Sequence, residues 1–195
     1  MRQAKMNRKT QETDISVAIS LDDSTPSRIQ TGIGFLDHML HLFSRHARVH
    51  LEIEAEGDLQ VDGHHTIEDI GIVLGGVMAR ALGDKRGLRR YGHIVLPMDE
   101  ALVSSSIDLS GRPYLVFEAS FTADAVGGFD TQMTEEFFRA IAVGAGMTLH
   151  LRQLYGRNDH HIIEAMFKAF AHSFAQAISI DPREQDHVLS TKGTL

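Results

Sequence analysis

Two short segments of the chain carry the residues best suited to metal chemistry. Each has the pattern His-His-x-x-Glu, formed by His64, His65 and Glu68 in the first segment and by His160, His161 and Glu164 in the second. The segments begin 96 residues apart, close to half of the 195-residue chain. Imidazole and carboxylate groups without sulfur suit Mn, Fe or Zn, and open positions favour a catalytic Mn or Fe site. A repeated pattern at half-chain spacing indicates an internal duplication that kept these residues in both copies.

The spacing within each segment predicts which side chains can share an ion. Residues four apart on a helix lie on the same face, whereas neighbours are turned from each other by about 100°. We therefore expect His64 and Glu68 to bind one metal ion and His65 to bind a second one. The second segment is expected to repeat this division.

One further ligand is expected from each half of the chain. His38 lies 26 residues before His64, on the polar face of a predicted helix, and is the expected additional ligand of the first half. Glu136 lies 24 residues before His160, also near the start of a predicted helix, and is its expected counterpart in the second half.

Apolar periodicity predicts the elements that must position these residues. Alternation predicts strands at 15–21, 48–56, 101–109 and 147–153, and helical spacing predicts helices around 36–43, 70–81, 134–145 and 163–174. Residues 1–13 are expected to form a polar lead-in, 114–119 a hairpin partner of the strand at 101–109, and 122–131 a glycine-rich loop. Strands and helices in two similar rounds predict an α+β fold.

Composition excludes several classes of protein. The chain has twelve histidines and no cysteine, which excludes disulfides, thiolate zinc sites and iron–sulfur clusters. A net charge of −7 argues against a nucleic-acid or anionic-membrane partner. No apolar run is long enough to span a membrane, and the polar N-terminus lacks a signal peptide's apolar stretch. We therefore expect a cytoplasmic protein.

Arg90 and Arg112 follow polar loops and could clamp a phosphate.

Six segments, in order along the chain, resemble imidazoleglycerol-phosphate dehydratases, the enzymes of histidine biosynthesis: residues 31–41, 62–71, 97–102, 108–114, 158–171 and 190–193. The resemblance covers nearly the whole length. It implies two similar halves, each a four-stranded sheet with helices packed on one face: residues 1–92 with the lead-in, and 93–195 with a substrate-binding tail. It also implies two Mn²⁺ ions per active site, and a homo-24-mer of trimers with active sites between subunits.

The resemblance also assigns residues. The implied metal ligands are His38, His64, His65, Glu68, Glu136, His160, His161 and Glu164. The implied substrate-binding residues are Glu12, His38, His64, Arg90, Arg112, His160, Lys168, Ser190 and Lys192. Glu12, Glu68 and Glu164 are the implied catalytic residues. The chain departs from the family pattern at Gly63, where Asp is common, at Glu136, where many relatives have His, and at Leu189, where Pro is usual.

The implied reaction is the Mn-dependent removal of water from D-erythro-imidazole glycerol phosphate, which gives imidazole acetol phosphate. Metal ions would bind the imidazole ring of the substrate, and a carboxylate would remove a carbon-bound proton. Glu12 is the first candidate for this acid/base, and Asp99 and Glu100 are alternatives. The residues alone also fit a dinuclear metal hydrolase acting on a small phosphate ester, or a non-enzymatic metal-storage or scaffold protein.

Overall fold

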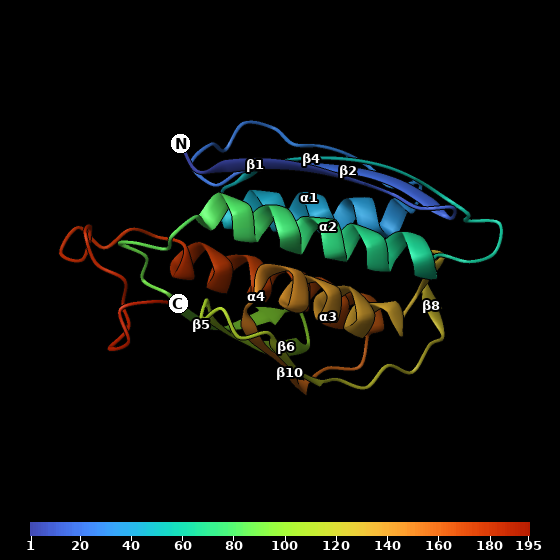
Figure 1. The fold of residues 1–195 in the computed structure, drawn as a ribbon. Helices are drawn as coiled ribbons and strands as arrows, with labels where there is room; N and C mark the ends of the chain where they lie inside the picture. The colour runs from blue at the N-terminus through green and yellow to red at the C-terminus, as the bar shows by residue number, and fades with distance from the viewer.

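Two four-stranded sheets enclose a double layer of helices in the computed structural model, which describes all 195 residues (Figure 1). The first half contains β1 (Gln3–Lys9), β2 (Thr13–Ser20), β3 (Arg28–Gln30), α1 (Gly34–Ala47), β4 (His50–Gly57) and α2 (His64–Leu82). The second half contains β5 (Tyr91–Met98), β6 (Ala101–Asp108), β7 (Tyr114–Glu118), β8 (Ala125–Val126), β9 (Phe129–Asp130), α3 (Met133–Ala145), β10 (Thr148–Tyr155) and α4 (Asp159–Ala177). None of the four helices combines the length and the apolarity that a membrane-spanning helix needs.

The two sheets have the same topology. Their strand orders are β1-β2-β4-β3 and β5-β6-β10-β7. In each sheet one edge strand, β3 or β7, runs parallel to its neighbour, and the other pairs are antiparallel. In each half, one helix precedes the last strand of that half and a longer helix follows it. This repetition confirms the predicted α+β fold of two similar halves.

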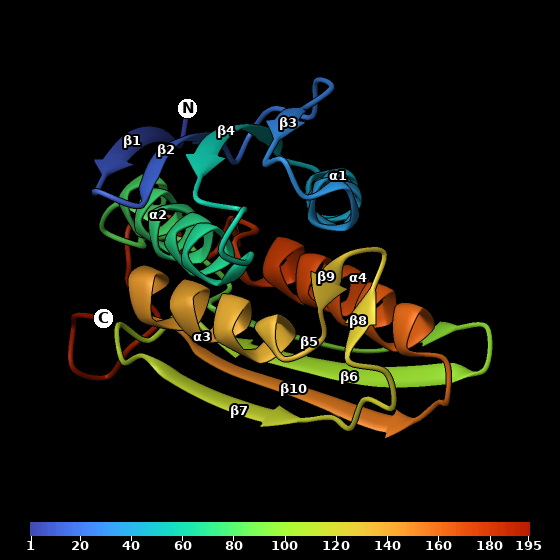
Figure 2. The same ribbon diagram turned by 90° about the vertical axis from the view of Figure 1, so that its right-hand side faces the viewer.

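The helices of the two halves pack against each other in the middle of the molecule. Figure 2 shows α1 and α2 beneath the first sheet and α3 and α4 above the second. Across the midplane α2 lies on α3 and α1 lies on α4. Helical spacing places Leu36, Met39 and Phe43 on the buried face of α1, where each is at most 1% exposed. Phe43 stacks on Phe170 of α4, with ring centroids 5.3 Å apart.

Several sequence-based predictions of local structure were wrong or incomplete. The predicted polar lead-in contains β1, an edge strand whose one apolar row, Ala4 and Met6, is only partly buried and therefore gives a weak pattern. Strand β5 went unpredicted for a different reason: its burial alternates, but Ile94 to Met98 are all apolar, so the sequence shows no alternation. Residues 114–119 do not form a hairpin with β6, because β10 inserts between β6 and β7 and pairs in parallel with β7.

The glycine-rich segment at 122–131 is a small hairpin rather than a featureless loop. Its strands β8 and β9 pair with each other, and Phe129 is fully buried against Phe35 of α1. Asp159, the first residue of α4, fixes the segment that leads into the hairpin. Its Oδ2 accepts hydrogen bonds from the backbone N–H of Thr122 and Ala123 and from the Thr122 hydroxyl. The hairpin therefore covers the end of the α1–α4 contact.

Candidate functional site

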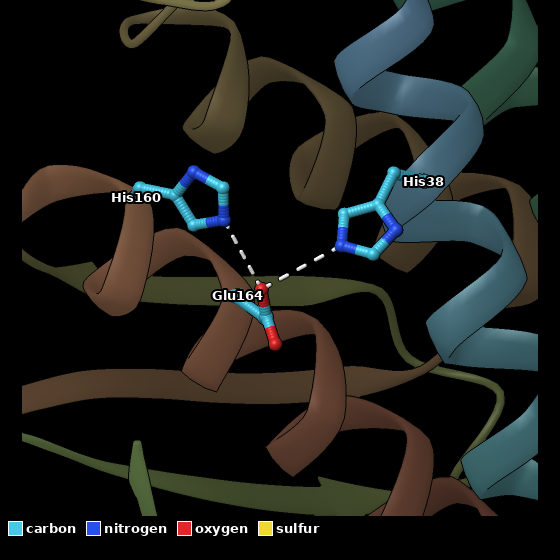
Figure 3. A group of neighbouring side chains, drawn as sticks. All are labelled: His38, His160 and Glu164. Atoms are coloured by element: carbon cyan, nitrogen blue, oxygen red, sulfur yellow. Dashed lines mark hydrogen bonds and ion pairs between the residues drawn. The ribbon is translucent and has the colours of Figure 1, made fainter. Parts of the chain in front are cut away.

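His38, His160 and Glu164 form a cluster of potential metal ligands where α1 meets α4 (Figure 3). The Glu164 carboxylate lies 3.2 Å from His160 Nε2 and 3.7 Å from His38 Nε2, and the three ligand atoms all lie within 4.8 Å of one another. His160 and Glu164 share a face of α4, as their spacing predicts. Asn158 begins this helix, since its side chain accepts hydrogen bonds from the backbone N–H of His160 and His161.

Lys168 keeps the buried carboxylate of this cluster ionised. Its Nζ lies 2.5 Å from Glu164 Oε1, one helical turn further along α4. Burial raises the pKa of Glu164, but the hydrogen bond and charge of Lys168, together with His160, outweigh burial and hold this pKa below its ordinary value. An ionised carboxylate beside two imidazoles is a suitable donor set for a divalent cation. Lys168, predicted as a substrate-binding residue, lies here at the cluster.

The cluster joins the two halves of the chain, whereas the spacing argument expected His38 to join the ligands of the first half. His38 belongs to the first half but lies with His160 and Glu164 of the second, because α1 packs on α4. The remaining expected ligands do not form a second compact group. His64 and Glu136 line one open depression between the starts of α2 and α3, and Glu136 also lies 3.6 Å from Arg139 on its own helix.

The second histidine of each motif is paired with a carboxylate. His65 Nδ1 lies 3.1 Å from Asp58 Oδ2, and His161 Nδ1 lies 2.6 Å from Glu100 Oε2. The hydrogen bond to Asp58 raises the pKa of His65, and the hydrogen bond to Glu100 raises the pKa of His161. In return, His161 and the backbone N–H of Asn158 lower the pKa of Glu100 to about 2.

These pairs place the second histidine of each motif apart from the first. The ring centroids of the two neighbouring histidines are 6.2 Å apart in the first segment and 6.1 Å apart in the second, with the rings edge to face. This separation agrees with the turn of about 100° between helix neighbours. The two histidines of a segment are therefore directed at different surroundings.

Glu12 lies in the turn between β1 and β2, close to the start of α2. Its carboxylate is about half exposed and lies 3.9 Å from His65 Nδ1. The turn is fixed by the Thr10 hydroxyl, which accepts hydrogen bonds from the backbone N–H of Glu12 and Thr13. The Thr13 hydroxyl in turn donates to Asp69, a buried carboxylate on α2. Asp69 thereby anchors the Glu12 turn beside the metal-binding motif.

Arg90 and Arg112 surround Asp108 at a separate place. Arg90 donates two hydrogen bonds to the Asp108 carboxylate, at 2.6 and 3.1 Å, and a third to the backbone oxygen of Leu189 in the C-terminal tail. Arg112 lies 3.7 Å from Asp108. Ser190 and Lys192 follow in the same tail, where the Lys192 N–H donates to the Ser190 hydroxyl.

The arginine cluster and the metal-ligand cluster lie at opposite ends of α4. The backbone N–H of Arg90 donates to Ala177, the last residue of α4, whereas His160 is its second residue. The helix has 19 residues and is therefore about 28 Å long. Figure 1 likewise shows the C-terminal segment at the end of the helical layers opposite to β8. Within one chain, a small phosphate ester cannot reach both clusters.

Sequence reasoning missed the carboxylates that support these residues, Asp58, Asp69 and Asp108, and assigned Glu100 only as an alternative base. A signal existed for Glu100, since it lies in the segment 97–102 that resembles the family. The sequence does not show which groups these four carboxylates contact, because most of their partners lie on other helices, strands or turns of the fold.

Known proteins resemble this chain over its whole length. The family model described as imidazoleglycerol-phosphate dehydratase matches residues 31–174. Proteins of that name from Methylorubrum extorquens and Streptococcus gordonii are each 56% identical over 195 residues, which is 100% of this chain and of each relative. The crystal structure of the dehydratase from Staphylococcus aureus has a TM-score of 0.84 at 45% identity and covers 92% of this chain and 99% of its own. That of the IGPD from Pyrococcus furiosus has a TM-score of 0.83 at 38% identity, with 97% and 100% covered.

The shared topology of the two sheets, the repeated His-His-x-x-Glu motifs and the full-length identity all point the same way. The chain belongs to the imidazoleglycerol-phosphate dehydratase family, and it is a dehydratase, a hydro-lyase of histidine biosynthesis.

Proposed function

We propose that this enzyme converts D-erythro-imidazole glycerol phosphate to imidazole acetol phosphate and depends on Mn²⁺ for the reaction. The observation that carries the proposal is the convergence of His38, His160 and Glu164 from two helices onto one point. Glu164 is 8% exposed at its side chain and is held ionised by Lys168, so the cluster offers two nitrogens and one oxygen in a partly desolvated place. Such a donor set fits Mn²⁺.

Eight residues would hold two ions in each active site: His38, His64, His65, Glu68, Glu136, His160, His161 and Glu164. Only three of them meet within one chain. The others do not form a second compact group, so a second copy would have to contribute ligands. Bound Mn²⁺ would supply a positive charge that stabilises negative charge developing on the imidazole ring of the substrate.

A phosphate site is proposed at the arginine cluster, with Arg90, Arg112, Ser190 and Lys192. The guanidinium groups offer paired donors to a phosphate, and Asp108 fixes Arg90 in place. Because this cluster is about 28 Å from the metal ligands along α4, the phosphate end and the imidazole end of one substrate would be bound by different copies. This separation supports active sites between subunits, and we propose the homo-24-mer that the resemblance implies. We also propose a cytoplasmic location.

Glu12 is the proposed acid/base. It is exposed, lies 3.9 Å from His65 and accepts no hydrogen bond at its carboxylate, so it is free to take a proton from substrate carbon. Glu100 is less suited, because three donors already occupy its carboxylate. Asp99 is exposed and lies 3.6 Å from His161 Nε2. Glu68 and Glu164 would contribute to catalysis as metal ligands.

The test is an assay of ketone formation from imidazole glycerol phosphate, with and without added Mn²⁺, run alongside an assay for inorganic phosphate. We expect Mn²⁺-dependent ketone and no phosphate release. Phosphate release without ketone would instead identify a metal hydrolase, and metal binding without either product would identify a storage protein. His160→Ala should lose both bound metal and ketone formation, and full metal content in that variant would contradict the ligand assignment.

A further inference from the structure

Two glutamates occupy equivalent positions in the two halves of the fold. Glu12 directly precedes β2 and Glu100 directly precedes β6, and these strands have the same place in their sheets. Each glutamate lies within 4 Å of Nδ1 of the second histidine in the motif of its own half. Both halves therefore contain the same pair, a turn carboxylate beside the second histidine of the motif.

In the second half this carboxylate is fully engaged. Glu100 Oε2 accepts a hydrogen bond from His161 Nδ1 at 2.6 Å. Its Oε1 accepts from the backbone N–H of Asn158 at 2.8 Å and of Arg157 at 3.3 Å. One side chain thus fixes both the entry into α4 and the ring of His161. The Nε2 nitrogen of that ring is left pointing away from Glu100, with Asp99 3.6 Å from it.

In the first half a different residue performs this task. Both oxygens of Asp58 lie within hydrogen-bonding distance of His65 Nδ1, at 3.1 and 3.3 Å. Asp58 follows the end of β4 and has no counterpart of the same type, since the residue after β10 is Gly156. A backbone hydrogen bond from the N–H of Asp58 to the carbonyl of Glu12 joins the two segments. With Nδ1 of His65 occupied, the Glu12 carboxylate remains at 3.9 Å.

We propose that Asp58 and Glu100 are positioning residues, which hold His65 and His161 with Nε2 available to a divalent cation. Because Asp58 holds His65 in the first half, Glu12 is not needed for this purpose. A carboxylate that accepts from one ring nitrogen fixes the tautomer and orientation of a metal-binding histidine, and its loss commonly weakens metal affinity 10- to 100-fold. The inference rests on the proposed function, because it assumes that these histidines are ligands. It explains why two equivalent glutamates differ: the carboxylate of Glu100 is occupied by three hydrogen-bond donors, whereas that of Glu12 remains available to a substrate.

The test compares Mn²⁺ binding in four variants of the full chain in its native assembly: Glu100→Gln, Asp58→Asn, Glu12→Gln and the control Glu54→Gln. Binding is measured by titration with Mn²⁺ alone, with free ion followed by electron paramagnetic resonance, so the readout does not depend on turnover. Glu54 is exposed on β4 and touches none of these residues, so its variant removes one negative charge only. Gln at position 100 keeps an oxygen for the backbone donors, and the side chain of Asp58 forms hydrogen bonds only with His65, so both variants should fold.

We expect Glu100→Gln and Asp58→Asn to bind Mn²⁺ about 10- to 100-fold more weakly than Glu54→Gln, with kcat recovering at saturating Mn²⁺. Glu12→Gln should bind Mn²⁺ like the control and lose kcat at every Mn²⁺ concentration. Affinities of Glu100→Gln and Asp58→Asn equal to the control would overturn the inference, as would a comparable loss of affinity in Glu12→Gln. If the wild type turns over with Mn²⁺ but these variants bind like the control, the inference alone fails. If the wild type binds no Mn²⁺, the proposed function fails with it.

Discussion

Replacing Gly75 by alanine tests how closely the two halves must approach for the ligand helices to be positioned. Gly75 lies on α2 where that helix crosses α3. A Cβ at this position would lie 2.7 Å from the carbonyl oxygen of Ile141, 2.9 Å from the backbone nitrogen of Ala145 and 2.9 Å from Cα of Gly144. All three atoms belong to the backbone of α3, so no side chain can move aside to make room.

The expected cost follows from these distances. Restoring ordinary contact beyond 3.4 Å requires the helices to separate by roughly 0.5–0.7 Å, and a gap of that size already forfeits about a quarter or more of the dispersion energy between facing atoms. Overpacking of this kind costs about 1–3 kcal/mol, while the better helix propensity of alanine returns about 1 kcal/mol. The net loss of about 0–2 kcal/mol corresponds to a midpoint of thermal unfolding lowered by up to about 8 °C for a chain of this size.

The neighbouring glycine supplies the matched control. A Cβ at Gly76 would lie 2.9 Å from the sulfur of Met6 and 3.0 Å from its terminal methyl, the flexible end of a side chain that can rotate away. Gly76→Ala should therefore leave the unfolding midpoint unchanged or raise it by a few degrees, because only the propensity term remains. Both variants are compared by calorimetry and by urea unfolding at one protein concentration. Equal midpoints for the two variants would refute the reasoning that backbone contact sets the distance between α2 and α3.

Three other outcomes are expected. Glu12→Gln should lower kcat by about 10²–10⁴-fold while the unfolding midpoint and the amount of bound Mn²⁺ stay unchanged; near-normal turnover would exclude Glu12 as the acid/base. Chelation of divalent ions should abolish ketone formation and lower the unfolding midpoint by several degrees, and Mn²⁺ should restore both, because an ion that binds only the folded state at 100 times its Kd adds about 2.7 kcal/mol. Burial holds the pKa of His46 below its ordinary value of 6.5, and the charge of His172, whose ring nitrogen lies 3.1 Å away, acts in the same direction. Protonation of His46 therefore favours the unfolded chain, and stability is lost as the pH falls below 6.5. Urea unfolding between pH 7.5 and 5, in steps of about half a unit, should therefore show a smaller loss in His46→Gln than in the wild type; equal losses would contradict this assignment.

The sequence predicted what depends on neighbours along the chain. The i, i+4 spacing of His160 and Glu164 predicted a shared face, and the structure confirms this, since the two side chains meet at 3.2 Å. Alternating apolar residues predicted β2, β4, β6 and β10, because one face of each strand is buried against helices. The half-chain repeat predicted the duplication, and contiguous motifs identified the family. All of these signals are local or periodic.

Partners across the fold could be found only in the tertiary structure. His38 lies with His160 and Glu164, not with the motif of its own half, because α1 packs on α4 and nothing in the sequence states which helices cross the midplane. Strand β7 pairs with β10 instead of β6 for the same reason: strand order is decided by packing over long separations. The carboxylates Asp58 and Glu100 gained their roles through contacts with histidines 7 and 61 residues away. Residue types and spacing therefore determined which chemistry is available, while the packing of helices between the two sheets decided which residues share a site.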